Sequence, residues 1–153
     1  MENARDLPAL TELIQLIRTE KIRFMVAGMS SAILQGVPVT TLDTDLWIGS
    51  PERRYTRLVH LSLKLGATLV RNTVVALRDG SLVNYLYRVD GLASFATEWR
   101  RAEEITFHGP RVKVVPLDRL IRSKEFIGRP KDLAHLPLLR DILASQKITR
   151  IKP

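Results

Sequence analysis

The stretch VAGMSSAILQGVPVTTLDTDLWI, residues 26–48, decides the fold of this chain. It begins inside a short apolar run, Ile22–Ala27, which predicts a buried strand, and Gly28 breaks that strand. Residues 29–35 suit a short helix, and the run Leu42–Ile48 predicts a second strand. The segment therefore places a glycine turn and a short helix between two strands.

The second strand carries two aspartates. Side chains alternate between the two faces of a strand, so Asp43 and Asp45 share one face, and the other face takes Leu42, Thr44, Leu46 and Ile48. Carboxylates held side by side repel each other unless a cation or hydrogen-bond donors compensate them, and Mg²⁺ prefers such oxygen ligands. The pair is a candidate metal site for phosphoryl or nucleotidyl transfer. The alternative is an edge strand with a solvated acidic face.

The glycine turn adds a second element to this interpretation. The backbone amides of Gly28, Met29 and Ser30 open a short helix, and helix N-termini attract phosphate oxygens. The alternative reading of Gly28 is an ordinary turn residue, and that of Ser30 is a capping hydroxyl.

The rest of the chain alternates helices and strands. We expect helices at about 8–20, at 50–65 with Ser50-Pro51-Glu52 as cap and first turn, and at about 92–103, 117–127 and 131–143. Strands are expected at 67–70, 74–78 and 82–89, with a hairpin turn at Asp79-Gly80, and at 105–107 and 112–115, with a turn at Gly109-Pro110. This order predicts an α/β (α+β) fold, a mixed sheet flanked by helices, in a single domain over residues 1–153.

Composition narrows the function classes. The 153 residues include no cysteine, which excludes disulfides and thiolate metal sites, and 45% of them are hydrophobic, enough for a core. The apolar runs are too short to span a membrane and the start lacks a secretory signal, so we expect a cytoplasmic protein with no membrane partner. The net charge of +8 favours polyanionic partners such as nucleotides or RNA. A merely basic, soluble surface is the alternative.

Residues 26–48 resemble the signature segment of the nucleotidyltransferase superfamily, in which a glycine turn precedes an Asp-x-Asp strand. The matching residues are Gly28, Gly36, Thr41, Asp43 and Asp45. A second segment, VVPLDRLIRSKEFIGRPKDLAHLPLL at residues 114–139, is similar to the family's lysine-containing helix and the turn after it. Its matching residues are Lys124, Arg129, Lys131 and Asp132. The branch resembled is a short bacterial one, related to minimal nucleotidyltransferases and AbiEii-type proteins.

The resemblance implies a nucleotidyltransferase-like sheet, a nucleoside triphosphate substrate, and Mg²⁺ or Mn²⁺ held by Asp43 and Asp45. Gly28 and Ser30 would bind the phosphates, and the remaining phosphate charge would be neutralised by Lys124, Arg129 and Lys131. The acceptor would be a hydroxyl of a protein, an RNA or a small molecule. Relatives also suggest a role in a toxin–antitoxin pair.

Two positions depart from the family pattern. Met29 stands where a second small residue is usual, and Asn84 stands where a third catalytic carboxylate is expected. Asparagine offers a carbonyl oxygen but no charge. Asp90 is six residues further along, too far on an extended strand to replace it, and no spacing singles out His60, His108 or His135 as a base. The second hypothesis is therefore a catalytically silent module that binds nucleotide, RNA or a protein.

Overall fold

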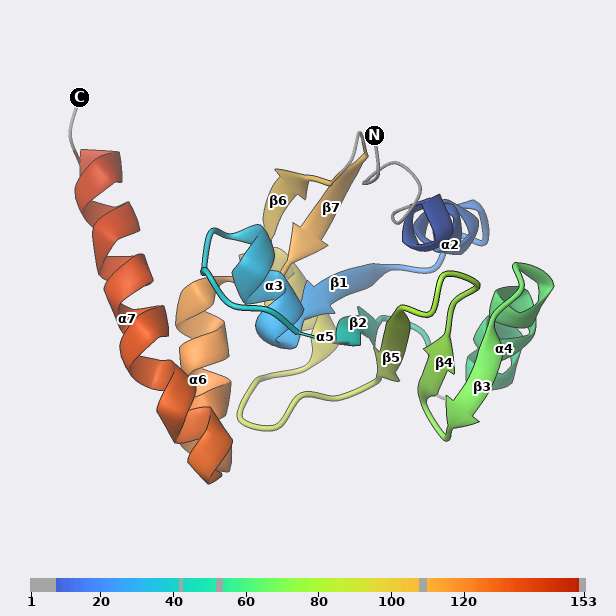
Figure 1. Ribbon diagram of the computed structural model, residues 1–153. Coiled ribbons are helices and arrows are strands. Elements are labelled where there is room, and N and C mark those ends of the chain that lie inside the picture. The colour runs from blue at the N-terminus through green and yellow to red at the C-terminus, as the bar shows by residue number, and fades with distance from the viewer. Residues whose placement is uncertain (1–7, 42, 52–53, 108–109, 152–153) are drawn as a thin grey trace.

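The computed structural model describes residues 8–41, 43–51, 54–107 and 110–151, which form one mixed sheet covered by helices on both faces (Figure 1). The helices in the described part of the chain are α2 (Pro8–Thr19), α3 (Gly28–Leu34), α4 (Tyr55–Lys64), α5 (Phe95–Arg101), α6 (Leu117–Ile127) and α7 (Pro130–Ile151). The strands are β1 (Phe24–Ala27), β2 (Asp43–Ile48), β3 (Thr68–Arg71), β4 (Val74–Ala76), β5 (Leu82–Leu86), β6 (Glu103–Thr106) and β7 (Arg111–Val114).

The sheet has the strand order β3-β4-β5-β2-β1-β7-β6. Strands β1 and β2 are antiparallel, with Ala27 opposite Asp45, whereas β2 pairs with β5 and β1 pairs with β7 in parallel. The outer pairs β3–β4, β4–β5 and β6–β7 are antiparallel. The segment that carries the aspartates therefore occupies the centre of the sheet and not an edge.

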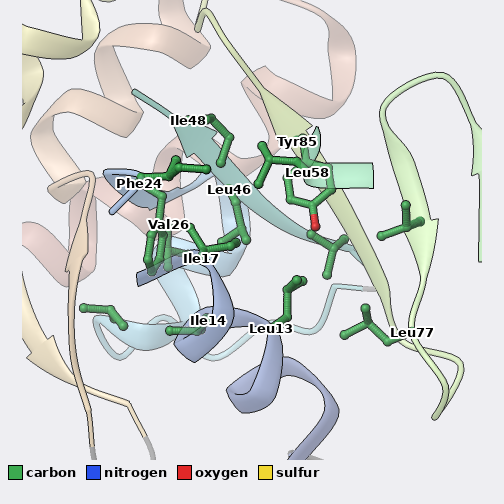
Figure 2. Packing of buried hydrophobic residues seen from close by; sticks show 14 of the residues in the cluster. Leu13, Ile14, Ile17, Phe24, Val26, Leu46, Ile48, Leu58, Leu77 and Tyr85 are labelled. Atoms are coloured by element: carbon green, nitrogen blue, oxygen red, sulfur yellow. The ribbon is translucent and has the colours of Figure 1, made fainter. Parts of the chain in front are cut away.

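Two apolar clusters hold helices against the two faces. On one face, α2 and α4 pack Leu13, Ile14, Ile17 and Leu58 against the strand residues that point the same way, including Val26, Leu46 and Tyr85 (Figure 2). On the other face, α3, α6 and α7 pack around Trp47, and α5 joins them through Phe95. Figure 1 shows α6 and α7 side by side on this second face.

The predicted α+β class with a mixed sheet flanked by helices is confirmed. Helix α6 has the predicted bounds, and Gly128 ends it in the left-handed conformation with φ 67°. The predicted hairpin at Asp79-Gly80 joins β4 to β5, and Gly80 has φ 89°. Among the described residues, no helix is long and apolar enough to cross a membrane.

Several predicted boundaries are wrong. The helix expected at 92–103 spans only Phe95–Arg101, because the Ser94 hydroxyl caps its start and Glu103 already pairs in β6. The strand expected to reach Val89 ends at Leu86. The helix expected to begin near Ser50 begins at Tyr55, and Glu52 of its expected first turn lies outside the described residues, as does Gly109 of the expected Gly109-Pro110 turn.

The last helix is longer than predicted. We expected it to end near Leu143, but α7 continues to Ile151. Residues 144–151 contain no glycine or proline to stop it. The side-chain amide of Gln146 also donates to the Gln35 carbonyl at 2.6 Å, which ties the second half of α7 to the end of α3.

Candidate active site

Asp43 and Asp45 lie on the same face of β2, as the alternation predicts. They lie on the face that carries Trp47 and the α3, α6 and α7 helices, while Leu46 and Ile48 enter the opposite core. Both aspartates are partly buried and line a cleft of about 520 Å³. Gly28, Met29 and Thr41 line the same cleft next to them.

Gly28 fits closely against Asp45. Its backbone has φ 58°, a left-handed conformation that favours glycine, and a Cβ added there would overlap Oδ2 of Asp45. The absence of a side chain at Gly28 therefore lets the Asp45 carboxylate lie directly against the start of α3. This gives the predicted glycine a physical reason within the candidate site.

Ser30 occupies a different place from the one predicted. Its hydroxyl donates to the Ala27 carbonyl at 2.7 Å and accepts the backbone N–H of Asp45 at 3.1 Å. A serine hydroxyl has one proton to donate, so none is left for a phosphate oxygen in this arrangement. Ser30 is also buried and is not among the residues that line the cleft. It holds the backbone at Asp45 in position.

Asn84 lies beside Asp45, because β2 and β5 pair in parallel with these two residues in register. The Thr73 hydroxyl donates to Asn84 Oδ1 at 2.6 Å, and the Asn84 side chain makes a hydrogen bond to the Asp45 carboxylate. Since a carboxylate only accepts, the Asn84 amide group must donate to it. The Thr73 hydroxyl therefore takes one of the two acceptor sites of the Asn84 carbonyl oxygen, and the Asn84 amide group acts on Asp45 as a donor.

The opposite wall of the cleft is basic. Lys124 comes from α6, and Arg129 and Lys131 come from the turn into α7. Asp132, which is only 2% exposed, contacts two of these cations. Lys124 Nζ lies 3.3 Å from Oδ1 of Asp132, and Arg129 Nε donates to Oδ2 of Asp132 at 2.6 Å. The four residues of the second predicted segment therefore form one cluster that faces the acidic pair.

The two walls have opposite electrostatics. Burial raises the pKa of Asp45 to about 6, and the neighbouring Asp43 charge adds to this, against the hydrogen bond from Asn84 and the charge of Lys124. The hydrogen bond from Arg129 holds the pKa of Asp132 at about 2, with Lys124 contributing in the same direction. The surroundings of Asp45 thus supply too little positive charge to compensate its carboxylate, whereas Arg129 and Lys124 compensate the carboxylate of Asp132.

The structure also brings in residues that sequence reasoning left aside. Strand β5 ends at Leu86, so the chain is not extended from Asn84 to Asp90, and Asp90 lines the same cleft as Asp45. The Ser123 hydroxyl donates to the Asp90 carbonyl at 2.7 Å, which fixes this loop on α6. A Cβ at Gly91 would crowd Phe126, so glycine permits this close approach.

Among the described residues, His135 is the histidine that lies in the candidate active site. It lines the cleft from α7, and its Nδ1 is buried without a hydrogen-bond partner among the described residues. Burial lowers the pKa of His135, and the Lys124 charge lowers it further, so the ring is neutral near pH 7. His60 lies exposed on α4, and His108 lies outside the described residues.

The donor set suits Mg²⁺ or Mn²⁺ with a triphosphate. Within the described part of the chain, no group of three or more Asp, Glu, His or Cys side chains could hold a metal ion by itself. Mg²⁺ is, however, commonly bound by one or two carboxylates together with water and substrate phosphates. The side-by-side Asp43 and Asp45, with the charge deficit at Asp45, fit that requirement.

The strand order, the helices on both faces and the acidic strand at the centre define a nucleotidyltransferase-like α+β fold. The antibiotic-resistance factor ANT(2'')-Ia, known from a solution structure, is 14% identical, with a TM-score of 0.65 over 97% of this chain and 89% of its own. The lincosamide antibiotic adenylyltransferase LnuA, crystallised with lincomycin, is 11% identical, with a TM-score of 0.61 over 88% of this chain and 96% of its own. At these identities the likeness establishes the fold.

No protein-family model matches the sequence, and no curated protein is similar enough to count as a relative.

Proposed function

We propose that this chain is a metal-dependent nucleotidyltransferase that moves a nucleoside monophosphate from a nucleoside triphosphate to a hydroxyl acceptor. The observation that carries the proposal is the arrangement of the cleft. Two partly buried carboxylates, Asp43 and Asp45, face the cluster of Lys124, Arg129 and Lys131 across one space of about 520 Å³. A nucleotidyltransferase-like fold with 97% of the chain aligned to ANT(2'')-Ia supports it.

Asp43 and Asp45 would hold Mg²⁺ or Mn²⁺, which supplies positive charge that neutralises the triphosphate and favours attack at its α-phosphorus. Lys124 and Arg129 each keep N–H donors beyond those given to Asp132, because an ammonium has three donors and a guanidinium has five. Asp132 fixes the direction of both cations. Lys131, which is exposed and also lines the cleft, adds a third charge for the outer phosphates.

In the reaction, the acceptor oxygen forms a bond to the α-phosphorus and the bond to the bridging oxygen breaks, so that pyrophosphate leaves. The proton of the acceptor hydroxyl needs a base, and the Asn84 amide cannot accept it. Asp90 and His135 also line the cleft and offer a carboxylate oxygen and a ring nitrogen as candidate bases, and burial lowers the pKa of His135. We assign the proton to one of these two residues.

The compound that receives the nucleoside monophosphate is proposed to be a small molecule with a hydroxyl group. Both fold neighbours are linked by name to antibiotics, which favours a small hydroxyl compound over the alternatives of an RNA or a protein. Association with a toxin or antitoxin, which the resemblance to AbiEii-type proteins implies, is a separate proposal. Co-purification with the product of a neighbouring gene tests it.

A catalytically silent module is the second candidate, and Asn84 specifically favours it. The position beside Asp45 carries a neutral donor, and the Ser30 hydroxyl is committed to the backbone. Such a protein would bind a nucleotide, an RNA or a protein without transfer. Its signature would be stabilisation by Mg²⁺ and triphosphate, about 2.7 kcal/mol at a ligand concentration 100 times the dissociation constant, with no product formed.

Labelling separates the two candidates. The purified protein is incubated with Mg²⁺ and each α-labelled nucleoside triphosphate, either with hydroxyl-bearing antibiotics that include lincomycin or with cell extract. We expect one labelled acceptor with the wild type and with Asp141→Asn, an exposed aspartate on α7 outside the cleft, and none with Asp45→Asn. Stabilisation without a labelled product would favour the silent module. The absence of both stabilisation and a labelled product would contradict both proposals.

A further inference from the structure

A second pocket lies at the other end of β1, around Trp99. Its volume is about 460 Å³, and we call it the Trp99 pocket; it is lined by Arg18, Lys21, Ile22, Arg23, Phe24, Trp99, Glu104, Arg111 and Lys113. It shares no lining residue with the candidate active site. The active-site cleft adjoins Ala27, whereas this pocket adjoins Phe24, about 10 Å away along the strand.

Positive charge dominates the Trp99 pocket. Five of the lining residues are Lys or Arg, and Glu104 is the only acidic residue among them. Glu104 is shared, with Arg111 at 3.5 Å and Lys113 at 4.0 Å. Within the described part of the chain, Arg18, Lys21 and Arg23 make no ion pair within 4.0 Å. Three of the five positive charges that line the pocket therefore have no counter-charge among the described residues.

Trp99 brings two of these charges together. The Arg23 guanidinium lies 5.2 Å and the Lys113 ammonium 4.9 Å from the centre of the indole ring, so the two charged groups are no more than about 10 Å apart. Phe95 stacks on Trp99 with its ring centre at 5.5 Å and fixes the indole. A cation–π contact orients a cation without neutralising it. The Arg23 charge is therefore available to a ligand, and Lys113 shares its charge with Glu104.

Lys21 has an unusual backbone for its residue type. It follows α2 with φ 59°, its N–H bonds to the Arg18 carbonyl, and the N–H of Ile22 bonds to the Ile17 carbonyl. These are the bonds of a Schellman motif, in which the left-handed position is usually glycine. A lysine there costs free energy locally and adds a fifth cation to the pocket. Lys21→Gly therefore removes the charge while it relieves the backbone.

We propose that the Trp99 pocket is a binding site for a ligand with two or more phosphate groups, separate from the triphosphate of the active site. Three of the five cations are arginines, whose planar donor sets match phosphate oxygens. The charges converge from the end of α2, the start of β1 and β7 on one small concave surface. An extended acidic peptide spreads its charges over up to about 3.3–3.6 Å per residue, whereas the phosphates of an oligophosphate share bridging oxygens and concentrate their charge. The source is either a free oligophosphate or the backbone of a single-stranded RNA.

Binding experiments without Mg²⁺ test the site with two probes, inorganic tripolyphosphate and fluorescent decauridylate, at about 50 mM salt. Lys21→Gly, Arg23→Gln and Arg111→Gln should each weaken binding about three- to tenfold, and each should lower the salt dependence of decauridylate binding by nearly one contact. Lys21→Arg should bind like the wild type. Lys21→Gly should melt at the same or a higher temperature, so its loss of binding cannot reflect unfolding.

The matched control is Lys64→Gln at an exposed position of α4, which should change binding less than twofold. Lys131→Gln reports any binding of the probes in the active-site cleft instead. Loss of tripolyphosphate binding in the pocket variants identifies a free oligophosphate site, and loss of decauridylate binding alone identifies an RNA site. The proposal is overturned if neither probe binds, if the pocket variants bind like the wild type, if Lys131→Gln has the larger effect, or if polyglutamate binds as tightly.

Discussion

Asp45 and Asp132 are carboxylates on facing walls of one cleft, and they differ in their surroundings. Burial and the Asp43 charge raise the pKa of Asp45 to about 6, whereas hydrogen bonds from Arg129 and Lys124 hold the pKa of Asp132 at about 2. A compensated carboxylate stabilises the fold, and an uncompensated one destabilises the metal-free protein while it favours a cation. The comparison thus separates a structural acid from a candidate ligand.

The largest effect is expected from Asp45→Asn. This change should abolish Mg²⁺-dependent triphosphate binding and nucleotidyl transfer. It should also stabilise the metal-free protein at pH 7 by at most about 3 kcal/mol, the equivalent of the raised pKa of Asp45. In a chain of this size that is a rise in melting temperature of about 6–12 °C. Asp141→Asn is the control, and a lower melting temperature for Asp45→Asn would show that the carboxylate supports the fold.

Asp132→Asn should act in the opposite direction. Its lowered pKa corresponds to about 2 kcal/mol of stability at pH 7, which the amide loses because Arg129 and Lys124 remain without their counter-charge. Thermal unfolding without metal should show a melting temperature about 4–8 °C below that of the wild type. The same variant should weaken triphosphate binding, because Lys124 and Arg129, the two proposed phosphate ligands, lose their orientation. An unchanged melting temperature would show that the Asp132 carboxylate does not stabilise the fold, and Asp132 would then not differ from Asp45 in this respect.

The stability of the metal-free protein should depend on pH through the titration of both Asp45 and Asp132. Because the folded pKa of Asp45 is raised, the native state binds more protons than the unfolded state between about pH 4 and pH 6, so stability increases as pH falls through this window. The slope cannot exceed about 1.4 kcal/mol per pH unit for one group. Below about pH 4 stability should fall, because the lowered pKa of Asp132 now acts.

Two comparisons check this profile by chemical denaturation. Asp45→Asn should have no rise in stability between pH 6 and pH 4, because the titrating group is gone. Saturating Mg²⁺ should stabilise the wild type at pH 7 and lose its effect below pH 6, since protonated Asp45 no longer attracts the ion. A flat wild-type profile would mean that Asp45 is compensated in solution.

Asn84→Asp should give the smallest change in stability, a loss of about 1 kcal/mol without metal, because Asp45 loses a hydrogen-bond donor and gains a negative neighbour. Isothermal titration should show tighter Mg²⁺ binding. If the wild type is a slow enzyme for want of a base, transfer should also increase. Unchanged Mg²⁺ affinity together with unchanged metal-free stability would show that residue 84 does not act on Asp45.

The sequence predicted the parts of the molecule that depend on local patterns. Alternation placed Asp43 and Asp45 on one face, and Gly128 ended α6. These two features follow from periodicity and caps, which act over a few residues. The position of Asn84 near the acidic pair was expected only from the resemblance to the nucleotidyltransferase segment, and the parallel pairing of β2 with β5 gives its physical basis.

The remaining features depend on contacts between distant residues. The loop after β5 folds onto α6 through Ser123 and Asp90, which are 33 positions apart, and this brings Asp90 into the cleft. The Ser30 hydroxyl is committed to Asp45 across the turn, 15 positions away. Periodicity carries no information on such pairings, so neither the exclusion of Asp90 nor the role given to Ser30 could be checked from the chain alone.

Asp43 and Asp45 are proposed to hold the metal of a bound triphosphate. Crystals grown with Mn²⁺ and a triphosphate that cannot be hydrolysed between its α- and β-phosphates test it most directly, through the anomalous signal of manganese. We predict a manganese peak bonded to carboxylate oxygens of both aspartates, with the phosphates between it and the cluster of Lys124, Arg129 and Lys131. A bound triphosphate whose manganese lies away from both aspartates would contradict the account.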